Sequence, residues 1–358
     1  MFHASIAVAA FVGAAALIAV RPWGLDEGLS ACGLAILEVG FGVLSPAGAV
    51  ASLRDAVPVL VFFAVLLTLV GLLARTSLID AGVNCVARLS QGSPVRLLGL
   101  ILAFAAAVTV VGTNDATALI LPVAVAPLIV SNRLPATPYV LGICFVANSA
   151  SFVLPTSNPA TLLALAHLHV SPLAAAGPLA VAGVLATLAT AGGTLLMARR
   201  SLAGAALAEV VAAGSRPARA PVPWSLLALV AGFTILVTGL EESGVTATLA
   251  RSVRGVSPFE AGVVAGVAAN LLNNLPTAIA VGAVVPNRLP HILSVIAGAD
   301  LGPNLAPLGS LSNLLILAGA RRAGIAVGWR QFLLWGLVLG PLSLLVGLAA
   351  LALFLGAR

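Results

Sequence analysis

The amino-acid sequence predicts an all-α polytopic membrane protein: an inverted-topology repeat with two re-entrant hairpins and two broken transmembrane helices. The first observation behind this prediction is composition. Of the 358 residues, 61% are hydrophobic and 8% are charged, whereas soluble proteins carry about 25% charged residues. The second is that apolar segments long enough to cross a bilayer follow one another along the chain. The third is that similar polar motifs interrupt apolar segments in both halves.

The first half of the chain, residues 1–198, is predicted to hold three spans, a hairpin, a broken helix and a further span. Its first apolar segment lacks the basic start and the small-residue cleavage site of a signal peptide, so we expect it to remain as a helix. In order, the predicted elements are 4–20, 29–44, 57–74, the hairpin 97–131, the broken helix 139–168 and the span 174–198.

Segment 97–131 is too long for one transmembrane helix and too short for two. Its only charged residue is Asp115, near the centre. As helices, the arms 97–112 and 116–130 would each be about 24 Å long, whereas the hydrocarbon core of a bilayer is about 30 Å thick. A re-entrant hairpin with its tip at 112–115 satisfies both lengths.

The second half, residues 224–358, repeats this order in shortened form. It comprises a span at 224–241, a hairpin at 259–286 with its tip at 273–276, a broken helix at 291–319 and a span at 331–356. Residues 199–223, which include GSRPARAPVP, are predicted to be a cytoplasmic linker between the halves.

Local sequence similarity supports the duplication. The two broken helices are interrupted by LPTSNP at 154–159 and by LAPLGS at 305–310. A shift of 160 positions places Asn114 and Thr117 of the first hairpin on Asn274 and Thr277 of the second. A shift of 152 positions places Asn148 on Asp300, and Asn158 on Ser310.

Arginine distribution predicts the orientation. All 17 basic residues are Arg, and 12 of them lie in loops that the predicted spans place on one face. Because basic loops are retained in the cytoplasm, that face is predicted to be cytoplasmic. Both termini then lie outside the cytoplasm, in the inner (plasma) membrane, and the two hairpins enter from opposite sides. Such an inverted-topology repeat is the plan of many secondary transporters.

Several other classes of protein are disfavoured. The arginines occur singly or in pairs without a basic-aromatic cluster, so a nucleic-acid partner is not expected. Cys32, Cys85 and Cys144 are far apart and form no metal-ligand pattern. No HExxH, GxSxG or P-loop motif is present, and an intramembrane aspartyl protease, a remote alternative, would require a Gly-x-Gly-Asp motif that Asp300 lacks. We therefore expect neither an enzyme nor a bound metal or cofactor.

The interruptions themselves are the candidate site. Irregular backbone at membrane depth is tolerated only where protein or a water-filled cavity surrounds it. Each interruption creates a half-helix whose N-terminus presents free N–H groups and a positive dipole. Asn158 followed by Pro159 is typical of a helix N-cap, Ser310 is a second candidate cap, and Pro276 suits a first helical turn. We expect these ends to converge on one polar solute.

Three acidic residues lie within apolar segments. Asp115, at the start of a half-helix, is favoured there electrostatically, so capping and solute binding are both compatible with its position. Asp300 lies about ten residues into its span, where an acid typically belongs to a transport pathway or proton site, although a satisfied buried acid is the alternative. Glu38 lies outside the duplicated motifs, and packing or an interface contact is the favoured interpretation.

Several segments resemble the bacterial arsenite/antimonite efflux carriers (the ArsB type) of the ion transporter superfamily. The resemblance is collinear and covers most of the chain apart from the central linker. The segments are NDATALILPVAV at 114–125, NNLPTAIAVGAV at 273–284, DLGPNLAPLGSLSNLL at 300–315, VANSASFVLPTSNP at 146–159, VRPWGLDEGLSA near the start, and the GWRQF loop.

This resemblance implies export of trivalent arsenic or antimony as neutral hydroxides, driven by proton antiport. It implies an inverted-repeat fold that is often a homodimer, and an arsenite-stimulated ATPase subunit is a further candidate partner. The implied solute site comprises Thr113, Asn114, Asp115, Asn148, Ser157, Asn158, Asn273, Asn274, Thr277, Asp300, Gly309 and Ser310.

The sequence departs from the family at two points. Asn148 stands where the family commonly has Asp, so one proton carrier is absent, and the second half lacks the two leading helices present at 4–44. For proton coupling, we therefore expect Asp300 to carry the proton and Asp115 to organise the site. A cation/proton antiporter or an organic-anion carrier on the same fold is the alternative function.

Overall fold

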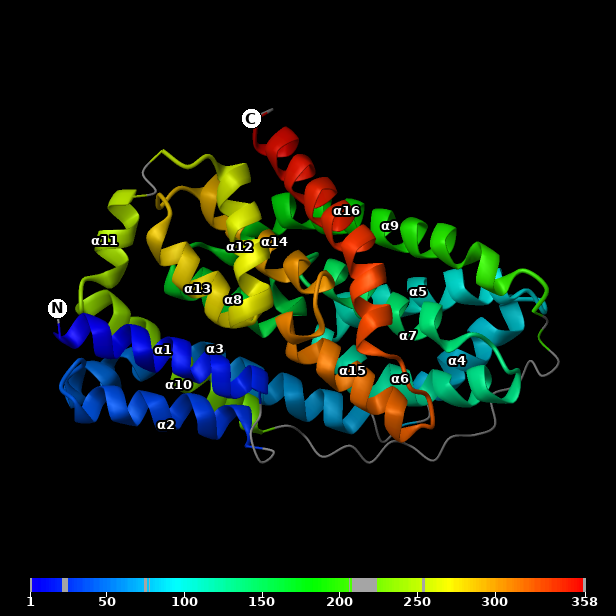
Figure 1. Ribbon diagram of the computed structural model, residues 1–358, viewed down its shortest axis with the longest axis horizontal. Coiled ribbons are helices and arrows are strands. Elements are labelled where there is room, and N and C mark those ends of the chain that lie inside the picture. The colour runs from blue at the N-terminus through cyan, green and yellow to red at the C-terminus, as the bar shows by residue number, and fades with distance from the viewer. Residues whose placement is uncertain are drawn as a thin grey trace.

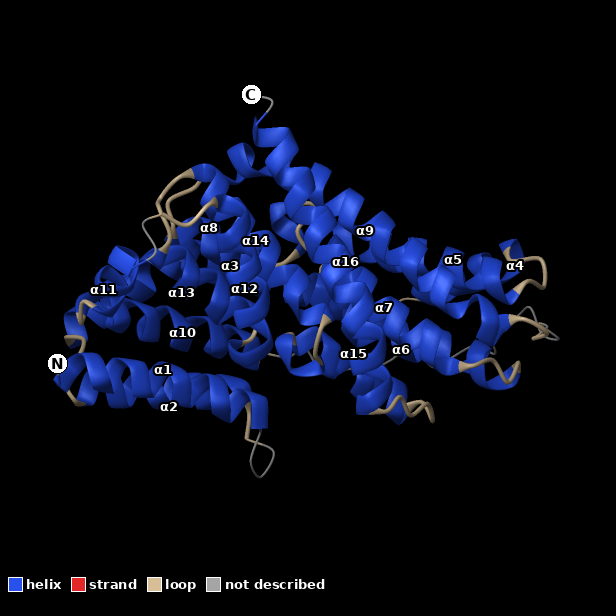
Figure 2. Cartoon of the chain, turned by 45° about the horizontal axis from the view of Figure 1, so that its top comes forward, coloured by secondary structure: helices blue, strands red, loops and turns tan. Residues whose placement is uncertain are grey.

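The structure is a computed structural model that describes residues 2–20, 25–73, 76, 78–205, 207, 224–252 and 255–356. Within these residues the chain forms helices joined by loops and turns, and no strand (Figure 2). The first-half helices are α1 (Phe2–Val20), α2 (Glu27–Gly40), α3 (Pro46–Leu73), α4 (Leu78–Leu89), α5 (Pro94–Val111), α6 (Asn114–Ser131), α7 (Ala136–Ala150), η2 (Pro155–Ser157), α8 (Pro159–His167) and α9 (Pro172–Leu202). The second-half helices are α10 (Ser225–Glu242), α11 (Val245–Ser252), α12 (Pro258–Leu272), α13 (Asn274–Val284), α14 (Leu289–Leu301), η3 (Gly302–Asn304), η4 (Pro307–Gly309), α15 (Leu311–Arg322) and α16 (Trp329–Gly356).

Four described helices, α5, α6, α9 and α16, are long and apolar enough to cross a membrane. The number rises to six if each of two bent helix pairs is one span. One pair is Pro46–Pro58 with Leu60–Leu69, bent by 49°, and the other is Leu227–Glu242 with Val245–Arg251, bent by 65°. The bend in α3 falls at Pro58, as expected for a residue that removes one backbone hydrogen bond of a helix.

The chain turns back between α5 and α6. Oγ1 of Thr109 and Oγ1 of Thr117 are 2.8 Å apart in a hydrogen bond, whereas residues eight apart on a straight helix are separated by about 12 Å. Each arm has 18 residues, which is longer than the sequence predicted. The Ser93 cap extends α5 in the N-terminal direction, and length alone therefore no longer distinguishes a re-entrant arm from a span.

The later interruptions fall close to their predicted positions. The turn between α12 and α13 is at Asn273, and the first broken helix is interrupted at 151–158. The second interruption begins earlier than predicted, at Gly302, and contains two short 3₁₀ helices, η3 and η4. In the second case the prolines at 303 and 307 explain the early end of α14, because proline cannot continue the hydrogen bonding of a helix.

Two helices, α4 and α11, were not predicted, and α3 begins 11 residues before the predicted span at 57. Hydropathy detects uniformly apolar segments, whereas α4 is amphipathic: it buries Ile79, Val83 and Val86 on one face. The start of α3 carries Arg54 and Asp55, which are polar but compatible with a helix.

The two halves of the sequence do not form separate cores. One hydrophobic core combines residues of α1, α2, α8 and α9 with residues of α10, α13 and α14. The other combines α4–α7 and α9 with α15 and α16. Figure 1 shows α10 beside α1 and α2, and α15 beside α6. The predicted linker begins within α9, and 206 and 208–223 lie outside the described residues.

Candidate functional site

A buried aspartate is the centre of one polar cluster, the acid half-site. Asp300 is in the last turn of α14 and is 2% exposed. Its Oδ1 accepts hydrogen bonds from Nδ2 of Asn158 at 2.8 Å and from Nδ2 of Asn274 at 3.3 Å. Its Oδ2 accepts a hydrogen bond from Oγ1 of Thr161 at 3.0 Å. Asp300 is therefore a buried carboxyl group whose oxygens are held by three hydrogen-bond donors from α8 and α13.

The donors of the acid half-site are held by helix starts. Asn158 is the N-cap of α8: its Oδ1 accepts a hydrogen bond from the Ala160 N–H at 3.0 Å, which leaves Nδ2 directed at Asp300. Pro159 occupies the first turn, where the missing N–H costs nothing. Asn274 opens α13, and its Oδ1 accepts a hydrogen bond from the Leu275 N–H at 2.9 Å.

A second cluster, the amide half-site, is centred on Asn148 of α7. The Oδ1 of Asn148 accepts a hydrogen bond from Nδ2 of Asn114 at 3.2 Å. Its Nδ2 donates to Oδ1 of Asn304 at 3.0 Å and to Oδ1 of Asn313 at 2.9 Å. The side chain of Asn304 in turn donates to Ser149 and Ser343. This cluster is buried and uncharged, and it joins the two halves of the chain.

Asp115 is oriented by the turn between α5 and α6. Thr113, not Asp115, is the N-cap of α6, because its Oγ1 accepts the Ala116 N–H at 3.0 Å. The Asp115 Oδ1 instead accepts a hydrogen bond from Oγ of Ser312, in the first turn of α15, at 2.9 Å. The sequence was compatible with capping or solute binding by Asp115. In the structure the capping role belongs to Thr113.

A cavity of about 40 Å³, the central cavity, lies where four half-helices begin. It receives Asp115 from α6 and the N-terminal residues of α8, α13 and α15, with Leu229 and Val230 of α10 on a further side. The residues that line it include no Arg, Lys or His. Amides, hydroxyls and one carboxylate at helix N-termini are the polar groups that this arrangement offers to a solute.

The turn at Asn273 is strained. Its φ of 75° and ψ of 158° lie in a region that is almost restricted to glycine and costs about 1–3 kcal/mol for other residues. The side chain of Asn273 makes no capping hydrogen bond to α13, and the residue lines the central cavity. Strain of this kind is concentrated at functional sites.

The structure separates the predicted site residues into two groups. Those that line the central cavity are Asp115, Asn158, Asn273, Asn274 and Ser310. Those that do not are Thr113, Asn114, Asn148, Ser157, Thr277, Asp300 and Gly309. Within the second group, Asp300 bonds the lining residues Asn158 and Asn274, and Ser157 donates to the Val110 carbonyl oxygen in the last turn of α5 at 2.9 Å. A side chain on Gly309 would contact Pro303, so this glycine permits close packing of η4 on η3.

Some contributing residues were missed by the sequence analysis. Thr161 and Ser312 bond directly to the two acids, and Asn304 and Asn313 complete the amide half-site. The available signal was a polar residue within an apolar helix, and three of these four lie within 300–315, a segment already quoted for its resemblance. Threonine inside a helix is too common for Thr161 to be selected on composition.

Three buried polar atoms beside these clusters have no hydrogen-bond partner among the described residues: Oδ1 of Asn114, Oγ1 of Thr277 and Oδ1 of Asn270. Buried polar groups are normally satisfied by protein or water, so these atoms are suited to bind water or solute hydroxyls. Glu38 is also buried without such a partner among the described residues, but it packs against Gly239 at the contact of α2 with α10, which agrees with the packing alternative of the sequence analysis.

Apolar helices of membrane-spanning length, together with a polar cavity where half-helices begin, are typical of a polytopic membrane transporter. Residues 3–305 match the model of the CitMHS family, described as citrate transporter. The family match agrees: it is to a family of transporters, not of enzymes. The chain belongs to this family of secondary transporters, within the ion transporter superfamily, and is a multi-pass membrane protein.

Curated relatives include arsenical pump membrane proteins. One from Escherichia coli is 30% identical over 146 residues, which are 37% of this chain and 34% of the relative, and one from Yersinia enterocolitica is 28% identical over the same shares. An uncharacterized transporter of Mycobacterium tuberculosis is 30% identical over 151 residues, 37% of this chain and 35% of the relative. Each match spans about a third of the relative's length, and it covers less of this chain than the quoted segments suggested.

Proposed function

We propose that this transporter exports trivalent arsenic or antimony, as neutral hydroxides, by proton antiport. The observation that carries the proposal is the central cavity, which is small, lined by amides, hydroxyls and helix N-termini, and lacks basic side chains. The partial similarity to arsenical pumps supports the same substrate class.

Size and charge favour a neutral hydroxide over citrate. A cavity needs at least about 10–15 Å³ to hold a water, so about 40 Å³ suits a solute with small polar groups. Citrate is larger and multiply charged, and it would face Asp115 with no cation among the lining residues. Because three scattered cysteines cannot form a trithiolate site, the bound metalloid would be held reversibly through its hydroxyls.

Proton coupling is assigned to Asp300. A neutral solute gains nothing from the membrane potential, so energy must be supplied through a group that titrates and is reached from both sides. Asp300 contacts Asn158 and Asn274, which line the central cavity, so solute binding and protonation share these two amides. Asp115, which lines the cavity itself, organises the site.

The proposed topology is an inverted repeat with both termini outside the cytoplasm. The arginine asymmetry and the recurrence of a helix pair followed by an interrupted helix support it. Cysteines introduced next to Met1 and Arg358 should react with an impermeant reagent applied to intact cells. A cytoplasmic position for the Arg358 end would contradict the inversion.

The decisive experiment measures metalloid accumulation in cells that lack their own exporter. Cells producing the protein should accumulate less arsenite than control cells, and inverted vesicles should take up arsenite when a pH gradient is imposed. The same vesicles should be assayed with citrate and with Na⁺. Citrate transport without arsenite transport would replace the proposal with the organic-anion alternative, and Na⁺/proton exchange alone would replace it with the cation alternative.

A further inference from the structure

A second polar cavity, the end cleft, lies at the opposite ends of the helices that begin at the central cavity. It has a volume of about 510 Å³ and is lined by residues of α3, α8, α10 and α13 and of the segments that follow α8 and α13. Three of these helices connect the two cavities: α8, α10 and α13 each contribute early residues to the central cavity and late residues to the end cleft.

The two cavities are separated by an apolar layer. Leu163 of α8 is a buried lining residue at the floor of the end cleft. Phe233 of α10 and Ile279 of α13, which line neither cavity, are buried in the same hydrophobic core as Leu163. From Ala160 at the central cavity to Leu163 at the floor of the end cleft, α8 rises by about 5 Å. A solute passing between the cavities would therefore need α8 and α13 to separate from α10 along this layer.

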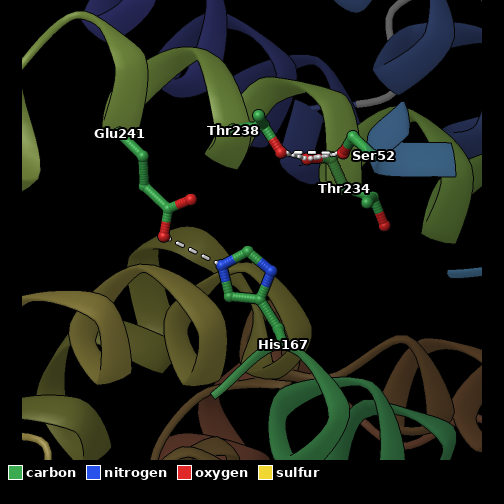
Figure 3. Close-up of polar contacts among 5 residues, drawn as sticks. All are labelled: Ser52, His167, Thr234, Thr238 and Glu241. Carbon is green, nitrogen blue, oxygen red and sulfur yellow. Dashed lines mark hydrogen bonds and ion pairs between the residues drawn. The ribbon is translucent and has the colours of Figure 1, made fainter. Parts of the chain in front are cut away.

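One polar contact joins α8 to α10 at the end cleft. Nε2 of His167, in the last turn of α8, lies 3.0 Å from Oε1 of Glu241 on α10 (Figure 3). The other wall of the cleft is joined separately, because Oγ of Ser52 on α3 is 2.7 Å from Oγ1 of Thr238 on α10 (Figure 3). Thus the polar contact of α10 with α3 involves hydroxyls, whereas its polar contact with α8 involves a histidine; α8 also packs against α3 and α13.

We propose that the end cleft is the outer mouth of the solute pathway and that the contact of His167 with Glu241 holds this mouth closed in a pH-dependent manner. His167 is then a positioning residue, acting through α8, whose first turns carry Asn158 and Thr161 of the acid half-site. This inference rests on the proposed transport function, because it assigns a pathway to the solute of the central cavity.

The sign of the pH dependence follows from the charges in the cleft. Histidine changes charge between about pH 5 and 8, and a protonated His167 forms an ion pair with Glu241, whereas a neutral one forms only a hydrogen bond. The other titratable lining groups are Asp55 on α3, Glu242 on α10 and His169 after α8; α13 contributes none. Because only a protonated histidine adds an ion pair to the hydrogen bond, acid in the outer medium should favour closure.

The expected effect is modest. The side chains of His167 and Glu241 are 17% and 39% exposed, and exposed ion pairs shift an equilibrium by about fivefold at most. Such a bias alters the fraction of open molecules without locking the carrier.

Cysteine labelling tests the contact without any transported solute. The background carries Cys32→Ser and Cys85→Ser. In it, Leu163→Cys, at the buried floor of the cleft, reports opening, and Ala166→Cys, exposed in the cleft, corrects for the pH dependence of thiol reactivity. In intact cells, the labelling ratio of Leu163→Cys to Ala166→Cys should rise severalfold between about pH 5.5 and 7.5. His167→Gln, which keeps a polar group but no charge, should abolish this dependence, and His169→Asn, the matched control, should retain it.

A labelling ratio that changes with pH equally in the His167→Gln protein would overturn the inference, and so would an unlabelled Ala166→Cys in intact cells. If the protein exports metalloid but its labelling ratio does not change with pH while His167 is present, only this inference is rejected. If the labelling ratio changes with pH but no metalloid is exported, only the proposed substrate is rejected. If Leu163→Cys fails to accumulate, the outer-pH profile of efflux replaces it: His167→Gln and Glu241→Gln should both flatten this profile, and His169→Asn should not.

Discussion

The centres of the acid half-site and the amide half-site, Asp300 and Asn148, occupy corresponding places in the two halves of the sequence. Their side chains differ in one atom, because Asn148 has an amide nitrogen where Asp300 has a second carboxyl oxygen. The 152-position shift that relates Asn148 to Asp300 also relates Thr161 to Asn313. Asp300 bonds Thr161, and Asn148 bonds Asn313. The 160-position shift relates Asn274 to Asn114, which likewise bond the two centres. Two of the three contacts of each centre therefore correspond, whereas those of Asn158 and Asn304 do not.

The difference lies in what each centre can do. A carboxyl group can bind and release a proton, whereas the Asn148 amide cannot, but the amide donates and accepts at once and therefore connects three other asparagines. We infer that the amide half-site holds the halves together and that the acid half-site changes state during transport. The following predictions test this division of roles, beginning with the largest expected effect.

Asp300→Asn should abolish transport driven by a pH gradient, because the carrier loses its titrating group. Exchange of labelled for unlabelled metalloid across the membrane should persist, since the asparagine still bonds its neighbours. Both rates are measured in the same inverted vesicles. Gradient-driven uptake at a near wild-type rate would show that Asp300 does not carry the proton.

Asn158→Ala and Asn274→Ala should each remove nearly all transport while the protein still accumulates in the membrane. Both amides line the central cavity and donate to Asp300, so their loss affects solute and proton together. Immunoblots of membrane fractions beside uptake rates separate the two effects. If folded protein is lost in proportion to activity, the roles are structural.

Asn148→Ala should chiefly affect stability. It leaves the amides of Asn114, Asn304 and Asn313 short of a buried partner, which typically costs about 1–3 kcal/mol. The melting temperature of the purified protein in detergent should fall, while the transport rate per folded molecule should decrease much less than in Asn158→Ala. An unchanged melting temperature with lost transport would reverse the roles assigned to the two half-sites.

Asn273→Gly should have the smallest effect and the opposite sign. Glycine adopts the φ of 75° found at this turn without strain, so the variant should be more stable by about 1 kcal/mol after the added flexibility of the unfolded chain is counted. A higher melting temperature with weaker solute binding would indicate that the strained asparagine serves the site. A lower melting temperature would exclude strain at this turn.

The sequence predicted the parts of the site that depend on neighbouring residues. A run of apolar residues, a proline, or an asparagine before a proline acts within one or two helical turns, and for this reason the half-helix starts at Asn158 and Ser310 were found at their correct positions. The positions of the interruptions, and the gathering of polar residues at them, were predicted on the same basis.

The partners of those residues could not be predicted, because hydrogen bonds between distant segments depend on packing. The sequence offered no reason to join Thr161 to Asp300, Ser312 to Asp115, or His167 to Glu241, pairs separated by 74 to 197 positions. The helix α4 was not predicted because only one of its faces is apolar, whereas the prediction relied on segments that are apolar along their whole length.

By itself the sequence determined that the chain is a helical membrane protein whose apolar helices are interrupted by polar motifs in both halves. Composition and local helix chemistry are properties of short segments, so they can be read without the fold. Only the tertiary structure decided that both hydrophobic cores draw helices from both halves, and that an acid from one half is bonded by amides from both. The physical reason is that apolar surfaces bury against whichever helix fits them, whatever its place in the chain.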